Sequence, residues 1–289
     1  MFSNVLVASD LSPASDHVLG CLRGLRLLGT ERIILTHALG IRHLEVMQYQ
    51  LAPLVEPKLR QQKQVLEKQG YQVELVIAPG IPSWEINRVA REKQASMIVI
   101  GSHGATLARA VLLGSVAVEV VHRAEVPVFV AQLRITDEAE QRCEMACDDF
   151  RSHVLFLTDF SDTAEGAFNY VEQIVRSGGR RVTLLHVQDK SSIHGHLEHK
   201  LEEFNRIDRE RLERMEKRLM ELGDAAVRIE LPYGLPKQEI VQRAEQGDYS
   251  LIVMGTQGRG YFGERFMGSV AYHVARRTVV PTLLIPPLR

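Results

Sequence analysis

The chain has 289 residues, enough for about two domains of roughly 150 residues each. Apolar residues make up 45% and charged residues 25%, as in ordinary globular proteins, while a formal net charge of −1 and 6% aromatic residues argue against a nucleic-acid surface. No apolar run approaches the ~20 residues of a membrane span, the start shows no signal-peptide pattern, and three cysteines form no disulfide framework, so we expect a cytoplasmic protein without a membrane partner.

Strands and helices alternate along the first half of the chain. Pro53 and Pro57 are expected to interrupt the second helix, because proline lacks the N–H and clashes with the preceding turn. Strands that are apolar at successive positions are typical of a parallel sheet covered on both faces by helices. The apolar patterns predict strands near 4–9, 32–38, 72–78, 97–101 and 126–131, and helices near 13–28, 44–69, 83–94 and 115–124.

The second half of the chain repeats the first. Asp10 in VLVASDLSPAS aligns with Asp159 in VLFLTDFSDTA, 149 positions later, and GIPSWEI aligns with GLPKQEI, 154 positions later. The second copy therefore carries five extra residues between His186 and Gly234, and its second helix, near 192–222, has no proline and is expected to run longer.

The spacing of about 150 residues between the two copies defines the expected domains. A repeat of about 150 residues indicates a domain duplication, since solenoid repeats have periods of ~20–50 residues. We expect a first domain at 1–133, a solvated linker, helical in part, at 134–150, and a second domain at 151–289.

Each copy contains a glycine-rich segment with the pattern G-x2-G-x9-G-S. It reads GSHGATLARAVLLGS at 101–115 and GTQGRGYFGERFMGS at 255–269, each after a short apolar run and before a helix-like segment. Glycine lets backbone N–H groups approach an anion closely, and a helix start adds unpaired donors and the positive end of its dipole. Ser115 and Ser269 are candidate helix N-caps and phosphate donors. A single GxxG indicates only a turn, but its recurrence in this context predicts two phosphate-binding loops.

Asp10 and Asp159 end the first predicted strand of each copy. Ligands of open parallel sheets bind beyond the carboxyl ends of the strands, where the strand order reverses. If the first and fourth strands are neighbours, each aspartate faces the glycine segment of its own copy. The segment would hold phosphates, and the carboxylate would hydrogen-bond a sugar or a base.

These features resemble the universal stress protein family in its tandem form. The resemblance rests on the SDLS and TDFS turns at 9–12 and 158–161, on both glycine segments and on the VPV and VPT final strands, and it covers nearly all of both copies. It implies two open parallel five-stranded sheets of order 3-2-1-4-5 with helices on both faces, a Rossmann-like α/β fold of the adenine nucleotide alpha hydrolase type. It also implies a stress-response protein regulated by adenine nucleotide, either ATP or AMP, with or without Mg²⁺.

The resemblance also implies where the nucleotide would lie. In each copy the aspartate would be at the adenosine end, the first glycine near the ribose, and the later glycines and the serine around the phosphates; Ala38 and Val187 would line the adenine pockets. The expected site of the first copy comprises Asp10, Ala38, Gly101, Gly104, Gly114, Ser115 and Val116. The expected site of the second copy comprises Asp159, Val187, Gly255, Gly258, Gly268, Ser269 and Val270.

The final strands, VPVFVAQ and VPTLLIPP, are apolar and β-branched. An apolar strand at a sheet edge invites association unless it is covered. We expect the two copies to pair through these strands as a pseudo-dimer inside one chain. A homodimer of chains is left open.

Catalytic groups are scarce. The sequence has no G-x4-G-K-[ST] loop whose lysine would reach the phosphates, and no carboxylate pair for Mg²⁺ accompanies the glycine segments. Arg109 and Arg265 fall within the nine-residue spacers and are either phosphate contacts or solvated arginines. We assign no catalytic residue and expect binding to exceed turnover, with a slow ATPase as an alternative.

Histidines offer a further alternative. His194, His196 and His199 form H-x-H-x2-H, which matches no strong zinc signature, so solvated histidines are the simpler interpretation and no metal ligand is assigned. His37 and His186 lie in predicted strands, where we expect packed, hydrogen-bonded side chains. A carrier or chaperone-like protein that binds an apolar ligand or a metal is the remaining hypothesis.

Overall fold

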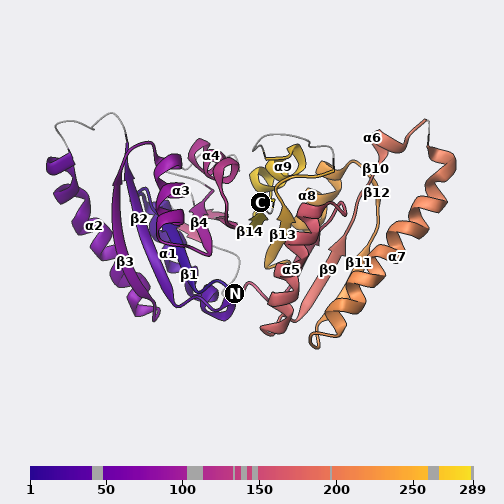
Figure 1. Cartoon of the computed structure of the whole chain (residues 1–289), viewed down its shortest axis with the longest axis horizontal. Helices are drawn as coiled ribbons and strands as arrows, with labels where there is room; N and C mark the ends of the chain where they lie inside the picture. Colours follow the sequence, from indigo (N-terminus) through magenta and orange to yellow (C-terminus); the bar gives the residue numbers. More distant parts are fainter. Residues whose placement is uncertain are drawn as a thin grey trace.

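The computed structural model describes residues 1–40, 48–102, 113–132, 134–137, 142–144, 149–195, 197–259 and 267–287. In this part of the chain the two copies lie side by side and share one ten-stranded sheet with helices on both faces (Figure 1). None of the helices in these ranges combines the length and the apolar character of a membrane span.

The first copy builds half of the sheet from parallel strands in the order β3-β2-β1-β4-β5, which confirms the expected 3-2-1-4-5 topology. Its elements are β1 (Asn4–Ala8), α1 (Pro13–Gly20), η1 (Leu22–Leu28), β2 (Arg32–Leu39), α2 (Gln48–Lys68), β3 (Gln72–Pro79), α3 (Pro82–Glu92), β4 (Met97–Gly101), α4 (Ser115–Arg123) and β5 (Val128–Ala131).

The second copy builds the other half in the matching order β11-β9-β8-β13-β14, again with parallel neighbours. Its elements are β8 (Val154–Leu157), α5 (Asp162–Arg176), β9 (Arg181–Leu185), β10 (Gln188–Asp189), α6 (Lys190–Ile193), η3 (Glu198–Lys200), α7 (Leu201–Met220), β11 (Ala226–Glu230), β12 (Tyr233–Gly234), α8 (Pro236–Gln246), β13 (Leu251–Gly255), α9 (Ser269–Arg277) and β14 (Thr282–Ile285).

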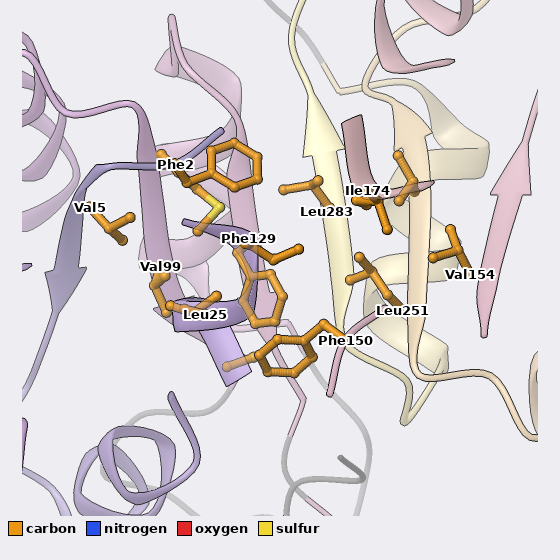
Figure 2. Close-up of a cluster of buried hydrophobic side chains, with 14 of the residues drawn as sticks. Phe2, Val5, Leu25, Val99, Phe129, Phe150, Val154, Ile174, Leu251 and Leu283 are labelled. Carbon is orange, nitrogen blue, oxygen red and sulfur yellow. The ribbon is translucent and has the colours of Figure 1, made fainter. Parts of the chain in front are cut away.

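The two halves join through their last strands, as expected for a pseudo-dimer within one chain. β5 and β14 pair antiparallel, with Phe129 opposite Leu283. Figure 2 shows the apolar side chains that meet around this seam, among them Phe129 and Phe150, whose rings pack edge to face with centroids 4.9 Å apart. Phe2 of the first copy stacks on Tyr170 of the second at 5.5 Å. The buried core on each face of the sheet therefore continues from one copy into the other.

The expectation that prolines interrupt the second helix was wrong. α2 is continuous through Pro53 and Pro57. Leu59, Gln62 and Leu66, which follow both prolines, are buried against the rest of the first copy. Packing of this face outweighs the local cost of proline, because tertiary contacts routinely override helix propensity.

The expectation of a longer second helix in the second copy was also wrong. The region splits into α6, η3 and α7, and α7 has 20 residues where α2 has 21. Gly195 follows α6 with φ +85°, a left-handed conformation that commonly ends helices at glycine. Between β10 and α7 the chain of this copy thus forms a short helix, a glycine turn and a 3-10 turn.

One more helical expectation needs correction. The helix predicted over 13–28 ends at Gly20, and a 3-10 helix continues from Leu22 to Leu28. In the expected linker two described segments, β6 (Arg134–Asp137) and β7 (Arg142–Glu144), form an antiparallel pair. The sequence RITD contains two β-branched residues, which favour extended backbone. The domain limits at 1–133, 134–150 and 151–289 stay a prediction.

Candidate functional site

The first and fourth strands of each copy are neighbours, as the sequence argument required. β1 pairs with β4 and β8 pairs with β13, and in each case the second strand of the copy lies on the other side of the first. The chain order of the strands therefore reverses between them, and the segments that follow these strands emerge at the same edge of the sheet. This is where open parallel sheets form ligand crevices.

In the second copy this edge contains a cavity of about 920 Å³. All seven residues that the sequence analysis assigned to this copy line it: Asp159, Val187, Gly255, Gly258, Gly268, Ser269 and Val270. The cavity falls within the ~300–1,000 Å³ of typical small-molecule sites. The structure thus brings the whole expected set together from the ends of β8, β9 and β13 and the start of α9.

Asp159 links the end of β8 to the glycine segment. Its Oδ1 accepts the Ser161 N–H at 3.0 Å, and its Oδ2 accepts the Arg259 N–H at 3.0 Å. The first bond holds the turn before α5, while the second reaches a residue 100 positions away. The aspartate therefore faces the glycine segment of its own copy, as predicted.

Three glycines of this site lie where a side chain would not fit without movement. A Cβ at Gly255 would come within 2.8 Å of Thr163 Cγ2, and a Cβ at Gly258 within 2.6 Å of Asp159 Oδ2. At Gly268 the nearest atom would be a backbone carbonyl oxygen at 3.2 Å. The glycine pattern in the sequence reflects this close approach of backbone to the neighbouring segments.

The expected N-cap serines are not the N-caps. Gly114 and Gly268 occupy the N-cap positions, and Ser115 and Ser269 are the first helical residues. In the second copy the Gly268 N–H donates to Thr256 O at 2.7 Å, which holds the glycine extended before the helix starts. No side chain caps the described first turn of either α4 or α9. The first-turn N–H groups therefore remain available to an anion.

The strand histidines are packed and hydrogen-bonded, as expected. His37 Nδ1 lies 2.8 Å from Ser9 O, and His186 Nδ1 lies 2.8 Å from Thr158 O. Each bond ties the end of the second strand to the end of the first. His186 also packs against the ring of Phe160 with centroids 4.6 Å apart. Both histidines thus act as structural supports at the edge where the ligand crevice forms.

The cavity of the second copy also contains a partly buried carboxylate, Asp208, that the sequence did not predict. Asp208 of α7 accepts a hydrogen bond from Gln188 Nε2 at 3.1 Å and lies 3.5 Å from His186 Nε2 and 3.7 Å from Arg211 Nη1. Burial alone would raise the pKa of Asp208, but the bonds from His186 and Gln188 and the charge of Arg211 together lower it. All four residues line the cavity.

Aromatic and basic side chains gather beside this group. The Arg211 guanidinium lies 5.1 Å from the centroid of Phe160, and that of Arg259 lies 5.6 Å from the same ring. Both arginines line the cavity and give it a basic wall. Apolar side chains of α6, α7 and the turn between them complete the lining: Ile193, Leu197, Phe204 and Ile207.

In the first copy the described site residues occupy the matching places. Asp10 Oδ1 accepts the Ser12 N–H at 3.0 Å and the Ser15 hydroxyl at 2.6 Å. Ala38 lies in β2, Gly101 ends β4, and Gly114, Ser115 and Val116 form the start of α4. Gly104, Arg109, Arg265 and His196 lie outside the described residues.

The remaining histidines of the H-x-H-x2-H pattern are exposed. His194 Nδ1 contacts Glu198 Oε1 four residues on, and His199 lies in the 3-10 turn η3. Within the described ranges no three histidine, cysteine or acidic side chains are grouped as metal ligands would be.

Comparison with known proteins agrees with this architecture. The family model described as Universal stress protein family matches residues 1–132 and 151–286. Universal stress protein MJ0577 of Methanocaldococcus jannaschii is 31% identical over 150 residues, which cover 46% of this chain and 93% of that protein. A universal stress protein of Mycolicibacterium smegmatis is 28% identical over 199 residues, covering 68% of this chain and 63% of that one.

A solved structure shows the same fold over the full length. The crystal structure of a universal stress protein from Archaeoglobus fulgidus superposes with a TM-score of 0.72 at 24% sequence identity, over 98% of this chain and 96% of that one. With the family model matching both copies, the chain belongs to the universal stress protein family.

Proposed function

We propose that the chain is a stress-response protein that binds an adenine nucleotide, ATP or AMP, in each copy and is regulated by its occupancy. The observation that carries the proposal is the cavity of the second copy, because its lining combines an aspartate with glycines and an uncapped helix start. A sugar or base needs the first kind of group, and phosphates need the second.

The proposed orientation follows from these chemistries. Phosphates would lie at Gly268, Ser269 and Val270, where the first-turn N–H groups of α9 carry the positive end of the helix dipole. The adenosine would extend toward Asp159 and Val187. Mg²⁺, where present, would supply positive charge to the phosphates, and the arginines of the basic wall would add to it.

Binding without efficient turnover fits the groups at hand. Among the described residues that line the cavity there is no lysine. His186, the lining residue best suited to proton transfer, has its Nδ1 engaged with Thr158 O and its Nε2 directed to Asp208. A slow ATPase stays an alternative, and single-turnover hydrolysis of radiolabelled ATP separates it from a binding protein.

A second candidate has its own support in the cavity. The apolar side chains from α6 and α7 would suit an apolar ligand of a carrier protein. A thermal-shift series with ATP, ADP, AMP and no nucleotide separates the candidates, since a carrier would show no nucleotide-dependent stabilisation.

Gly114→Asp and Gly268→Asp test the nucleotide sites directly. Each places a carboxylate at an N-cap, where it would accept the same first-turn N–H groups that the phosphates need and would repel their charge. Aspartate is a good N-cap, and a Cβ at Gly114 would make only ordinary contact at 3.7 Å, so we expect Gly114→Asp to fold.

Isothermal titration calorimetry with ATP then counts the sites. We expect two nucleotides bound to the parent chain, one to each single variant and none to the double variant. Gly20→Asp, which adds the same charge at an exposed glycine with nothing within 4 Å, is the matched control and should bind two. Two nucleotides bound to the double variant would refute the proposed sites.

A further inference from the structure

Gln62 is a buried polar residue of α2 that is hydrogen-bonded to the end of β1 in the first copy. It is only 2% exposed. Its Oε1 accepts the Ser9 hydroxyl at 2.8 Å, and its Nε2 donates to Asp16 Oδ1 at 2.7 Å. A carboxylate only accepts hydrogen bonds, so Asp16 fixes the orientation of the amide. The oxygen of Gln62 therefore faces Ser9.

The Ser9 hydroxyl in turn supports the turn that contains Asp10. A hydroxyl has one proton to donate, and that of Ser9 goes to Gln62, because the oxygen of an amide cannot donate. The Ser9 oxygen then accepts the Leu11 N–H at 3.1 Å. Leu11 has φ +63°, a left-handed conformation that is uncommon outside glycine. The bond to Ser9 therefore helps to hold an unfavourable backbone directly after Asp10.

The second copy builds the same turn with a stiffer side chain. Thr158 Oγ1 accepts the Phe160 N–H at 2.9 Å, and Phe160 has φ +59°. The branched Cβ of threonine restricts its χ1 rotation, whereas serine exchanges more freely among staggered rotamers. Threonine can thus hold this turn by itself, while serine needs a partner that orients its hydroxyl.

The residue of the second copy that corresponds to Gln62 is Met215, which is also buried. Two pairs of buried leucines in α2 and α7, each 153 positions apart, set this alignment: Leu59 with Leu212, and Leu66 with Leu219. Methionine has no amide to orient a hydroxyl. The first copy therefore combines serine with glutamine, and the second combines threonine with methionine.

We infer that Gln62 is a positioning residue of the first site, which orients the Ser9 hydroxyl and so keeps the turn that presents Asp10 to the ligand; this rests on the proposed function. Gln62 acts through Ser9 and does not itself contact the nucleotide. The docking of α2 on the first copy and the binding of ATP at the first site are therefore coupled through one buried side chain.

Gln62→Met tests the inference in the full chain, because it introduces the residue of the second copy with a side chain of the same length. Gly268→Asp leaves only the first site to titrate with ATP, and Gly114→Asp leaves only the second. We expect Gln62→Met to weaken ATP binding at the first site by about ten-fold and to leave the second site unchanged. Gln61→Met, at an exposed neighbouring position of α2, is the matched control and should change neither site.

Ser9→Thr combined with Gln62→Met installs the pair of the second copy and should restore ATP binding at the first site. A glutamine that only filled space would not be replaced by a change at Ser9. Hydrogen exchange of the Leu11 N–H, followed by NMR without nucleotide, gives a readout that does not depend on ATP. Exchange should be about ten-fold faster in Gln62→Met and should slow again in the double variant, while the Phe160 N–H stays unchanged.

Either an unchanged ATP affinity of the first site or an unchanged Leu11 exchange rate in Gln62→Met would overturn the inference and leave the proposed function standing. A loss that Ser9→Thr rescues in neither readout would assign Gln62 to packing alone and would also overturn it. No ATP binding to the first site of the Gly268→Asp chain would overturn both the inference and the proposed site. Gln62→Leu is a second variant, and failure of both Gln62 variants to fold in thermal unfolding would overturn the positioning role.

Discussion

Gly258 lies so close to Asp159 that any side chain at position 258 would have to displace the Asp159 carboxylate or the backbone beside it. A Cβ at position 258 would be 2.6 Å from Asp159 Oδ2, the same atom that accepts the Arg259 N–H at 3.0 Å. The contact joins the end of the first strand of this copy to the segment that follows its fourth strand. The aspartate and the glycine segment therefore form one continuous wall of the cavity.

Gly258→Ala is expected to weaken ATP binding at the second site by about ten-fold. The added methyl group must displace either the carboxylate or the backbone beside it, and a charge-assisted hydrogen bond is lost with either movement. Calorimetry of the variant in the Gly114→Asp background measures the effect. Gly20→Ala, where nothing lies within 4 Å of the added Cβ, should leave ATP affinity unchanged. Equal affinity in Gly258→Ala and the parent chain would contradict this account of the wall.

Asp159→Ala removes the acceptor of two backbone N–H groups, those of Ser161 and Arg259. We expect the free energy of unfolding to fall by about 1–2 kcal/mol, since a lost cap or charged acceptor typically costs that much. ATP binding at the second site should be lost with it, while the first site stays intact. Asp10→Ala is the equivalent substitution in the first copy and should abolish ATP binding at the first site only. Titration of both variants, with urea unfolding alongside, tests the pairing of each aspartate with its own copy.

The sheet order and the grouping of the expected residues of the second copy around one cavity were predictable from local signals. Apolar runs marked the strands, and the repeat placed Asp159 and Gly255 at the ends of strands that had to be neighbours in the family topology. A segment whose backbone passes close to a neighbouring group favours glycine, as at Gly258 beside the Asp159 carboxylate, so such positions carry their constraint in the sequence.

Features decided by tertiary packing were not predictable in this way. The prolines of α2 signalled a break, yet the buried Leu59 and Leu66 beyond them keep the helix continuous. The Gln188–Asp208 pair was missed because its two members are 20 residues apart and meet only through the docking of α7. Ser269 was misplaced by one residue because the helix start depends on a backbone bond from Gly268 to Thr256 O.

His153 should make the stability of the second copy depend on pH. Its Nδ1 lies 2.8 Å from Asp248 Oδ1 and its Nε2 lies 3.0 Å from Thr183 Oγ1. The neutral ring suits both partners, since Nδ1–H donates to the carboxylate and Nε2 accepts from the hydroxyl. Burial lowers the pKa of His153, with a smaller opposing effect from Asp248. The folded state therefore binds this proton less readily than the unfolded chain does.

The sign of the effect follows from that difference. In the unfolded chain a histidine has a pKa near 6.5. The contribution of neutral His153 to the free energy of unfolding is therefore fully present above about pH 6.5, and it falls as the pH drops from there through the lower pKa of the folded state. Urea unfolding from pH 7.5 to 5 should show this loss, and His153→Gln should show less of it. Some loss should remain, because burial also lowers the pKa of His122 and His273. His199→Gln, at an exposed position, controls for the loss of a histidine. If His153→Gln lost stability with falling pH just as the parent chain does, His153 would not be a source of the pH dependence.

Phe129→Ala tests whether the two copies form one cooperative unit. Phe129 is fully buried in β5, stands opposite Leu283 across the seam and packs edge to face on Phe150. Truncation of a buried phenylalanine typically costs about 3–5 kcal/mol, whereas Leu54→Ala, at a side chain that is 72% exposed, should cost little. Because the cores of both copies meet at this residue, unfolding followed by circular dichroism and by the fluorescence of Trp84 in the first copy should shift together. A variant in which only the first copy loses stability would show that the seam joins two independent domains.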